Sequence, residues 1–342
     1  MSEESVRPST VQRLLLLLFL LIAYGRVAWR LGFQDLWWDE SLSLQRAESA
    51  LLPLLRGDLI IYDGLSLLPT IDQHPFAFFL IQSGLLRLAG DSEFVLRYTS
   101  VMAVTLLPAV LWVFARWFVR KDIWPSSTPY WTAGFAAISP FFLWFGQEAR
   151  PYALWGLFAP LSTYLLLRAI ESRQIRWGWA IGFLVAEFLF LTSHYYAAFL
   201  LPVHVTLIFF WLRQRNRVLA WIVSGLLLVA AALMALATYW FFFIVQSGGE
   251  NFASLRLKDL IPDLLNAFSL GLSVDIAQVW WFDLLFGAVM LLGAVWSLRS
   301  RKTIANYGWL APALIVVPVA MLWLVNQILP AYMTARHMSL LG

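Results

Sequence analysis

The sequence predicts an all-α polytopic membrane protein, and three observations support that prediction. Of the 342 residues, 61% are hydrophobic and 13% are charged, against roughly 25% charged residues in an ordinary soluble domain. The mean hydropathy is +0.73. Apolar runs long enough to cross a bilayer as helices recur along the chain. The small net charge of +4 argues against nucleic-acid binding, and the absence of cysteine excludes disulfides and thiolate metal sites.

Ten apolar segments are predicted as membrane helices. The first, Leu14 to Leu31, is longer than the apolar part of a secretory signal, so we expect it to be retained. The others are 76–89, 95–119, 129–145, 152–169, 177–193, 196–211, 218–245, 282–298 and 307–329.

The placement of basic residues predicts which connections face the cytoplasm. Four alternate connections are basic, and the positive-inside rule assigns them to the inner side. The other connections then face outward, as expected for a multi-pass protein of a bacterial inner membrane with its site on the periplasmic or exterior side. Segment 76–89 does not fit this alternation of inner and outer connections. As a helix it is about 21 Å long, which is too short to cross the bilayer, so we expect it to dip into the membrane or lie obliquely. The basic connections are Arg116 to Lys121, Arg168 to Arg176, Arg213 to Arg217 and Arg299 to Lys302.

The first long outer loop, 32–75, is the segment where we expect chemistry. It holds seven acidic residues against two basic ones, and 50–56 and 59–68 are predicted as short interfacial helices. Its sharpest element is Trp37-Trp38-Asp39-Glu40. The indoles suit the headgroup level, where partial desolvation raises the proton affinity of a carboxylate and makes it a usable general base. The alternative is that Asp39 only caps a helix from Glu40 to Ala50.

Four motifs in this order resemble the landmarks of the family 39 type C-type membrane glycosyltransferases, which include protein O-mannosyltransferases and the aminoarabinose transferase of lipid A. They are Trp37 to Ser41, His74-Pro75, Ser92 to Ser100 and Gln147 to Tyr152.

The resemblance spans residues 14–210 and implies a catalytic module with a GT-C-like helix bundle, in which an acidic pair of the first outer loop matches Asp39 and Glu40. The chain departs from the pattern at Phe76, where a second proline often follows. We expect one domain, in which residues 211–342 form variable helices with an outer loop at 246–281. The apolar ending predicts further helices beyond residue 342.

The chemistry implied by the resemblance needs one base. A sugar on a polyprenyl phosphate has a leaving group that departs as an anion, so no general acid is required. Asp39 is the predicted base, and direct displacement predicts inversion at the anomeric carbon. Glu40 lies about 100° away on a helix and is expected to support the base or bind a metal. Arginines or a divalent ion (Mg, Mn or Zn) would stabilise the departing phosphate, and the acceptor would be a lipid, glycan or protein.

Arg150 and Arg97 are the candidate phosphate contacts on this side. Arg150 lies at the predicted outer rim, where its guanidinium can bind a phosphate in bidentate fashion. Tyr152, two residues further on, is a candidate substrate contact. Its alternative is a structural pair with Glu148. Arg97 is a candidate substrate contact, but support of its own helix through Glu93 is the simpler interpretation.

Histidines and a terminal arginine complete the candidates. His194 is predicted to bind a metal or the lipid phosphate, or else to anchor the interface. His74 is expected to serve a positional or a substrate-binding role, and Arg336 to contact phosphate. His204 is predicted to hydrogen-bond between helices. Glu187 lies within a helix, where an ionisable group marks a candidate functional site.

A transporter or flippase for a lipid-linked intermediate is the alternative function. Such a protein is expected to carry its ionisable groups near the bilayer midplane on broken helices. Here most of them cluster at the outer boundary beside aromatic residues, which favours the enzyme.

Overall fold

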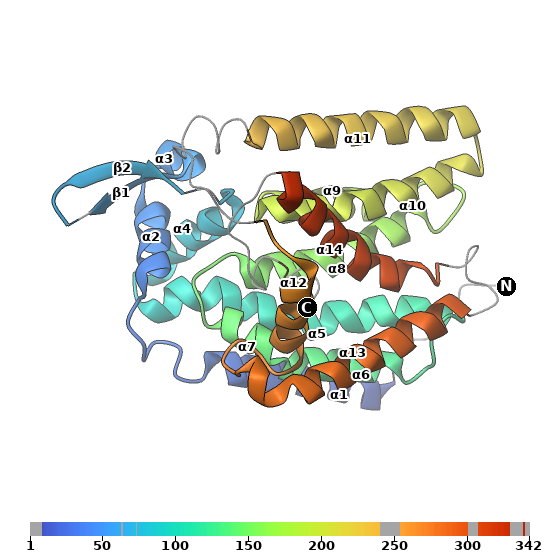
Figure 1. Ribbon diagram of the computed structural model, residues 1–342, viewed down its shortest axis with the longest axis horizontal. Coiled ribbons are helices and arrows are strands. Elements are labelled where there is room, and N and C mark those ends of the chain that lie inside the picture. The colour runs from blue at the N-terminus through green and yellow to red at the C-terminus, as the bar shows by residue number, and fades with distance from the viewer. Residues whose placement is uncertain are drawn as a thin grey trace.

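The computed structural model describes residues 9–62, 64–72, 74–239, 254–299, 307–328 and 338. It confirms a mostly helical polytopic membrane protein (Figure 1). Within the described residues, seven stretches are long and apolar enough to cross a membrane. They lie in α1 (Thr10–Ala28), α5 (Glu93–Arg120), α8 (Tyr152–Ile170), η1 with α10 (Tyr195–Leu200, Leu201–Arg213), α11 (Arg217–Tyr239), α13 (Ile276–Arg299) and α14 (Leu310–Ile328).

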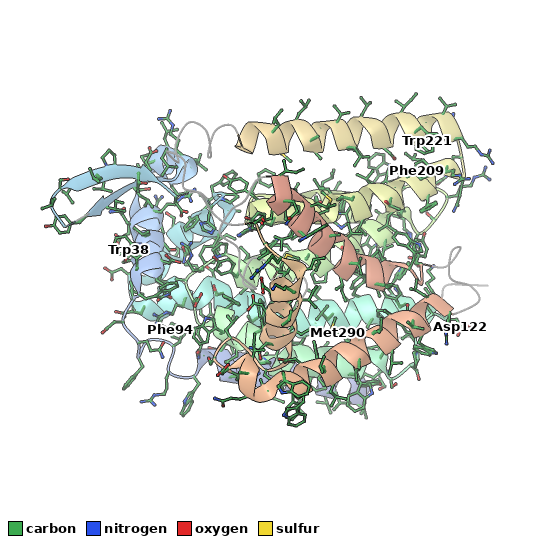
Figure 2. The ribbon with its side chains drawn as sticks, viewed as in Figure 1. Trp38, Phe94, Asp122, Phe209, Trp221 and Met290 are labelled. Carbon is green, nitrogen blue, oxygen red and sulfur yellow. The ribbon has the colours of Figure 1, made fainter. Side chains whose placement is uncertain are left out.

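Helix α5 forms the centre of the bundle. It has 28 residues, about 42 Å of helix, and packs against α1, α6 (Thr128–Ile138) and α8. Trp117, Phe118 and Trp155 are fully buried at these contacts. At the edge of the bundle, α11 packs mainly on α10, where the rings of Phe209 and Trp221 lie 4.7 Å apart (Figure 2). Most of its other large apolar side chains are exposed, as expected of a helix that faces lipid.

Three of the basic connections, and the described residues on either side of the fourth, meet at one end of the bundle, which we call the basic end. Lys121 Nζ lies 2.8 Å from Glu171 Oε1, which joins the ends of α5 and α8. The indole of Trp211 donates to a main-chain carbonyl between α8 and α9 (Trp177–Leu191). Tyr307 packs on Trp117 at 5.2 Å between ring centroids, which brings the start of α14 to the same place. The alternation of charge along the sequence therefore corresponds to the arrangement in space.

Helix α4 (Ala77–Ala89) lies at the opposite end, which we call the site end, and does not cross the bundle. Its first main-chain N–H, on Ala77, donates to the carbonyl of Thr192 just after α9, at 3.0 Å. Gln82 Nε2 donates to the carbonyl of Leu96 in the first turn of α5, at 2.9 Å. Because α9 ends and α5 begins at the site end, α4 links two points of the same end, which accounts for the break in the predicted alternation.

Two predicted membrane segments have different boundaries. Segment 129–145 is divided at Pro140 into α6 and α7 (Pro140–Gly146), because proline has no N–H to continue the helical hydrogen bonds. Arg26 Nη1 donates to the carbonyl of Ala137 near this break, at 3.0 Å. The segment predicted at 282–298 begins earlier, at Ile276, and the predicted outer loop 246–281 contains α12 (Leu257–Ser269).

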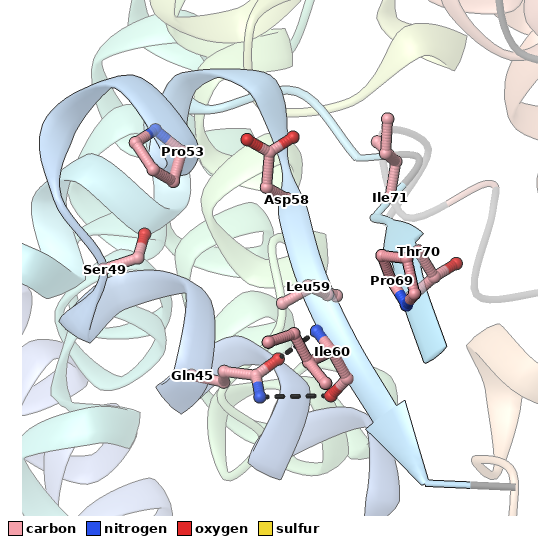
Figure 3. Close-up of a pocket in the computed structure, with 9 residues that line it drawn as sticks. All are labelled: Gln45, Ser49, Pro53, Asp58, Leu59, Ile60, Pro69, Thr70 and Ile71. Atoms are coloured by element: carbon pink, nitrogen blue, oxygen red, sulfur yellow. Dashed lines mark hydrogen bonds between the residues drawn. The ribbon is translucent and has the colours of Figure 1, made fainter. Parts of the chain in front are cut away.

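The outer loop forms α2 (Trp38–Glu48), α3 (Leu51–Arg56) and a β-hairpin. A short helix at 50–56 is confirmed, but the helix predicted at 59–68 is wrong: β1 (Asp58–Tyr62) pairs antiparallel with β2 (Leu67–Ile71). The run Leu59 to Tyr62 is rich in the branched and aromatic residues that favour strands. The hairpin projects past the site end (Figure 1). Gln45 occupies its outer edge, accepting from Ile60 N at 3.0 Å and donating to Ile60 O at 3.1 Å (Figure 3).

We predict that Gly57→Ala destabilises the protein more than Gly64→Ala. Both glycines have positive φ, +82° and +98°, so alanine is strained at either position, by roughly 1–2 kcal/mol. Only at Gly57 would the added Cβ also meet a backbone atom, the carbonyl oxygen of Asp72 at 2.7 Å. Thermal unfolding of both variants in one detergent measures the difference. Equal losses of stability would contradict the close approach of Gly57 to the carbonyl of Asp72.

Candidate active site

Most of the predicted site residues meet at the site end of the bundle. They come from the first turn of α2, the segment after the hairpin, the start of α5, the connection between α7 and α8, and the connection between α9 and η1. Arg336 lies outside the described residues. The residues brought together are Asp39, Glu40, His74, Arg97, Arg150, Tyr152 and His194.

Glu40 and Arg97 form a buried bidentate ion pair. Arg97 Nε donates to Glu40 Oε1 at 2.8 Å and Nη2 to Oε2 at 2.7 Å, and both side chains are almost completely buried. The other three guanidinium N–H groups donate to main-chain carbonyls of Leu31, Gln34 and Asp35. A guanidinium has five donors, and here all five are used. The partner of Arg97 is therefore Glu40 and not Glu93, and Arg97 has no donor left for a substrate phosphate.

Glu40 is also saturated as an acceptor. Besides Arg97, it accepts from Ala149 N at 2.8 Å and from Trp37 N at 3.5 Å. A carboxylate offers about four acceptor positions, and these four contacts occupy them. The expected metal-binding role of Glu40 is not supported by this geometry: its carboxylate ties the outer loop to α5 and to the connection before α8.

The side chain of Asp39 leaves the helix about 100° around the axis from that of Glu40 and has different surroundings. Its side chain is 23% exposed, against 1% for Glu40, and Asp39 Oδ2 lies 4.0 Å from Arg150 Nε. The alternative that Asp39 caps the helix is wrong, because α2 begins at Trp38 and Trp37 is its N-terminal cap.

Arg150 is buried beside Asp39 but is held by longer contacts than Arg97. Nη1 lies 3.4 Å from the carbonyl of Asp39 and 3.3 Å from Ser43 Oγ, and Nη2 lies 3.2 and 3.3 Å from the two ring nitrogens of His74. Arg150 Nε is buried and has no hydrogen-bond partner among the described residues. The expected alternative partner, Glu148, accepts from the indole of Trp144.

His74 is oriented by two residues that sequence reasoning missed, Asp72 and Arg46. Asp72 Oδ1 lies 2.8 Å from His74 Nδ1 and also accepts from the backbone N of His74 at 3.0 Å. Arg46 Nη1 donates to Asp72 Oδ2 at 3.1 Å. An aspartate two residues before a main-chain N–H often bonds to it in a turn, so the spacing of Asp72 and His74 was the available signal. Nothing in the sequence pointed to Arg46.

The charges of this cluster follow from its burial. Desolvation lowers the pKa of His74 and the positive charge of Arg150 lowers it further, so His74 is neutral at pH 7. Burial alone would raise the pKa of Asp72, but its contacts with His74 and the charges of Arg150 and Arg46 hold that pKa well below its ordinary value. Asp72 is therefore ionised, and because a carboxylate only accepts, His74 Nδ1 is the donor.

His194 and Tyr152 complete the aromatic wall of the site. His194 stacks on Trp155 at 4.4 Å between centroids, and its Nδ1 accepts from the backbone N of Tyr196 at 3.3 Å. The ring of His74 lies 5.5 Å from that of His194 and 6.4 Å from that of Tyr152. Within the described ranges no group of three or more His, Asp or Glu side chains is placed to hold a metal ion. The described residues therefore do not fit the expected metal.

The two ionisable residues predicted inside helices are partners. His204 Nδ1 lies 3.1 Å from Glu187 Oε1, and its Nε2 lies 2.9 Å from Thr163 Oγ1. This chain of contacts joins α8, α9 and α10, so the expected interhelical role of His204 is confirmed.

A pocket of about 710 Å³ opens beside the site, between α2, α3 and the hairpin (Figure 3). Asp39 and Arg150 do not line it. Its polar lining consists of Gln45, Ser49, Asp58 and Thr70.

Comparison with known proteins identifies the family. A family model described as dolichyl-phosphate-mannose-protein mannosyltransferase matches residues 73–245, about half of the chain. The chain belongs to this family. Membership makes it a membrane glycosyltransferase of the GT-C type, as the sequence motifs predicted, and favours an enzyme over a transporter. No curated protein and no solved structure matches the chain significantly.

The segment matched to the mannosyltransferase family contains only part of the site. His74, Arg97, Arg150, Tyr152 and His194 lie within residues 73–245. The acidic pair of the outer loop precedes the match, so its place in the site rests on the contacts described above.

We predict that the two neighbouring carboxylates differ in their effect on stability. Glu40→Gln leaves the buried guanidinium of Arg97 without its counter-charge, which typically costs about 3–5 kcal/mol. Asp39→Asn changes a partly exposed carboxylate and should leave the unfolding temperature close to that of the unmodified protein. Thermal unfolding in detergent compares them; an Asp39 variant as unstable as the Glu40 variant would refute this division.

Proposed function

We propose that this chain transfers a hexose or pentose from a polyprenyl-phosphate donor to a hydroxyl or amine acceptor, at the site end of the bundle. This reaction is the one implied by the resemblance to the family 39 type glycosyltransferases. The name of the matched family specifies mannose on dolichyl phosphate and a protein acceptor; for this chain we propose that donor class, with a lipid, glycan or protein as acceptor. We further propose that the basic end is cytoplasmic and that the site faces the exterior or periplasm of a bacterial inner membrane.

In the proposed reaction the acceptor attacks the anomeric carbon while Asp39 takes the acceptor's proton. The bond between that carbon and the phosphate oxygen breaks, and the polyprenyl phosphate leaves as an anion. No proton donor to the leaving group is needed. A single displacement inverts the configuration at the anomeric carbon.

The contrast between two buried arginines supports this proposal. Arg97 uses all five of its donors in hydrogen bonds of 2.7–3.2 Å and has none left for another partner. Arg150 makes contacts of 3.2–3.4 Å and keeps an unpartnered Nε, 4.0 Å from the partly exposed carboxylate of Asp39. Contacts of this kind commonly tighten only when substrate is present. Arg150 therefore has the donor capacity to bind a phosphate beside the proposed base.

The remaining residues take supporting roles in the proposal. His74, His194 and Tyr152 line the space around Arg150 with polar and aromatic side chains, and we propose that they contact the donor. Glu40 and Arg97 hold the loop in place. We propose that Arg150, and not a metal, provides the positive charge for the departing phosphate.

We predict that Asp39→Asn abolishes sugar transfer. A general base contributes roughly 10²–10⁴-fold to a rate, so transfer should fall by at least a hundredfold. The assay follows radiolabelled mannose from a polyprenyl phosphate donor into membrane lipids, glycans and proteins. Glu48→Gln, an exposed carboxylate on the same helix, is the matched control and should transfer at the rate of the unmodified protein. Transfer by the Asp39 variant at that same rate would refute the base assignment.

A further inference from the structure

A buried carboxylate on α13, Asp283, has no positive partner among the described residues. It lies about 10 Å along the helix from Ile276, in a stretch apolar enough to cross a membrane. Asp283 is 4% exposed, whereas the adjacent Phe282 is 41% exposed, so the carboxylate faces the helices packed on α13 and not the lipid. We propose that Asp283 binds an alkali-metal cation together with Asn266 and Ser269 of α12.

Asn266 and Ser269 lie in the last turn of α12, which packs against α13 and α7 (Figure 1). Ser269 Oγ lies 2.6 Å from Asp283 Oδ1 and 3.3 Å from the carbonyl of Asn266, so it contacts both other residues. That carbonyl already accepts from Leu270 N and Gly271 N, each at 3.0 Å. The hydroxyl of Ser269 therefore donates to Asp283, and the short distance is that of a hydroxyl bound to a charged carboxylate.

Two buried oxygens of this cluster have no hydrogen-bond donor. Asp283 Oδ2 and Asn266 Oδ1 both lack a partner in the part of the chain that the structure describes, and Asn266 is 5% exposed. Asn266 Nδ2 donates to the carbonyl of Val274 at 3.0 Å. This contact fixes which end of the amide is the oxygen, because two acceptors would face each other in the flipped amide. Leaving such buried acceptors unsatisfied is costly.

The charge of the cluster is negative from every side that the structure describes. Asp283 carries the one full charge, and the C-terminal end of α12 adds partial negative charge from its carbonyl groups. A carboxylate within a membrane segment is costly unless it is paired or coordinates an ion. A cation bound to Asp283 Oδ2 and Asn266 Oδ1 balances the charge and satisfies both oxygens.

The ligands favour a hard cation with a single charge. Carboxylate, amide and hydroxyl oxygens suit hard cations, and these three side chains offer no imidazole or sulfur ligand. One carboxylate balances one positive charge, whereas a divalent ion would leave a net charge buried. The C-terminal ends of helices inside membrane proteins also coordinate sodium. This site shares no residue with the candidate active site, and its ion differs from the divalent metal expected there.

The bound cation joins α12 to α13 and thereby supports α7. The rings of Phe268 and Phe141 lie 4.5 Å apart between α12 and α7. The turn after α12 needs Gly271, which has φ +96°, and a Cβ there would lie 3.1 Å from Pro140 Cβ. The end of α12 is therefore packed closely on the first residues of α7, and we expect the cation to stabilise this contact.

The first test is equilibrium binding of radioactive sodium, and of radioactive rubidium as a larger alkali cation, to the full chain in detergent. Choline chloride keeps the ionic strength constant. We expect at least one of the two ions to bind saturably at one site per chain, and Asp283→Asn to abolish this binding. Asp275→Asn is the matched control: Asp275 is exposed, and its Oδ1 accepts from Ala277 N at 3.0 Å, a bond that asparagine can keep. This variant should bind like the unmodified protein.

The second test is thermal unfolding in the same detergent. The unfolding temperature of the unmodified protein should rise by about 2–4 °C when the cation replaces choline at tenfold its Kd, and that of Asp283→Asn should not change. Should Asp283→Asn fail to fold, Asn266→Ala keeps the carboxylate but removes one ligand oxygen, and its Kd should be roughly tenfold higher.

Three results would overturn the proposal. The first is the absence of saturable binding of either ion to the unmodified protein. The second is undiminished binding by Asp283→Asn or, where that variant does not fold, by Asn266→Ala. The third is an unfolding temperature that depends on pH but not on the alkali cation, which would mean that Asp283 binds a proton instead.

Discussion

The buried ion pair between Glu40 and Arg97 joins three segments that lie far apart in the sequence. Through it the outer loop, the first turns of α5 and the connection before α8 share one set of hydrogen bonds. Burying two charges is costly unless every donor and acceptor is satisfied, and here they are. The position of Asp39 depends on this arrangement, because Asp39 is adjacent to Glu40 in the first turn of the same helix.

The candidate site holds ionisable residues in two different states of hydrogen bonding. Of two adjacent carboxylates one is saturated and the other partly exposed, and of two buried arginines one uses all its donors and the other does not. Both pairs are alike in residue type, so the different roles that we propose for their members follow from their surroundings. A catalytic group needs a position that is fixed while its bonding capacity remains available, and saturated neighbours provide the fixed position.

The sequence predicted the seven long apolar helices of the described residues, but it also counted 76–89, 129–145 and 177–193 as membrane helices, and these are not among the seven. It also predicted the outer loop that contributes residues to the candidate site. These follow from apolar length and charge placement, which act locally. The hairpin was missed because a short apolar run suits an interfacial helix as well as a strand. The partner of Arg97 was missed because Glu40 is 57 residues away in the chain, whereas Glu93 is one helical turn away. Asp72 was within reach, since its spacing from His74 is that of a local turn. Arg46 was not, because its contacts depend on how α2, α3 and α4 pack.

The most direct measurement is an experimental structure of the full chain with a non-reactive analogue of a polyprenyl-phosphate sugar. The account predicts phosphate oxygens within hydrogen-bond distance of Arg150 Nε, the anomeric carbon on the side of Asp39, and the Glu40–Arg97 pair unchanged. A phosphate bound at the basic end, or one that takes Arg97 from Glu40 while Arg150 stays unbound, would contradict it.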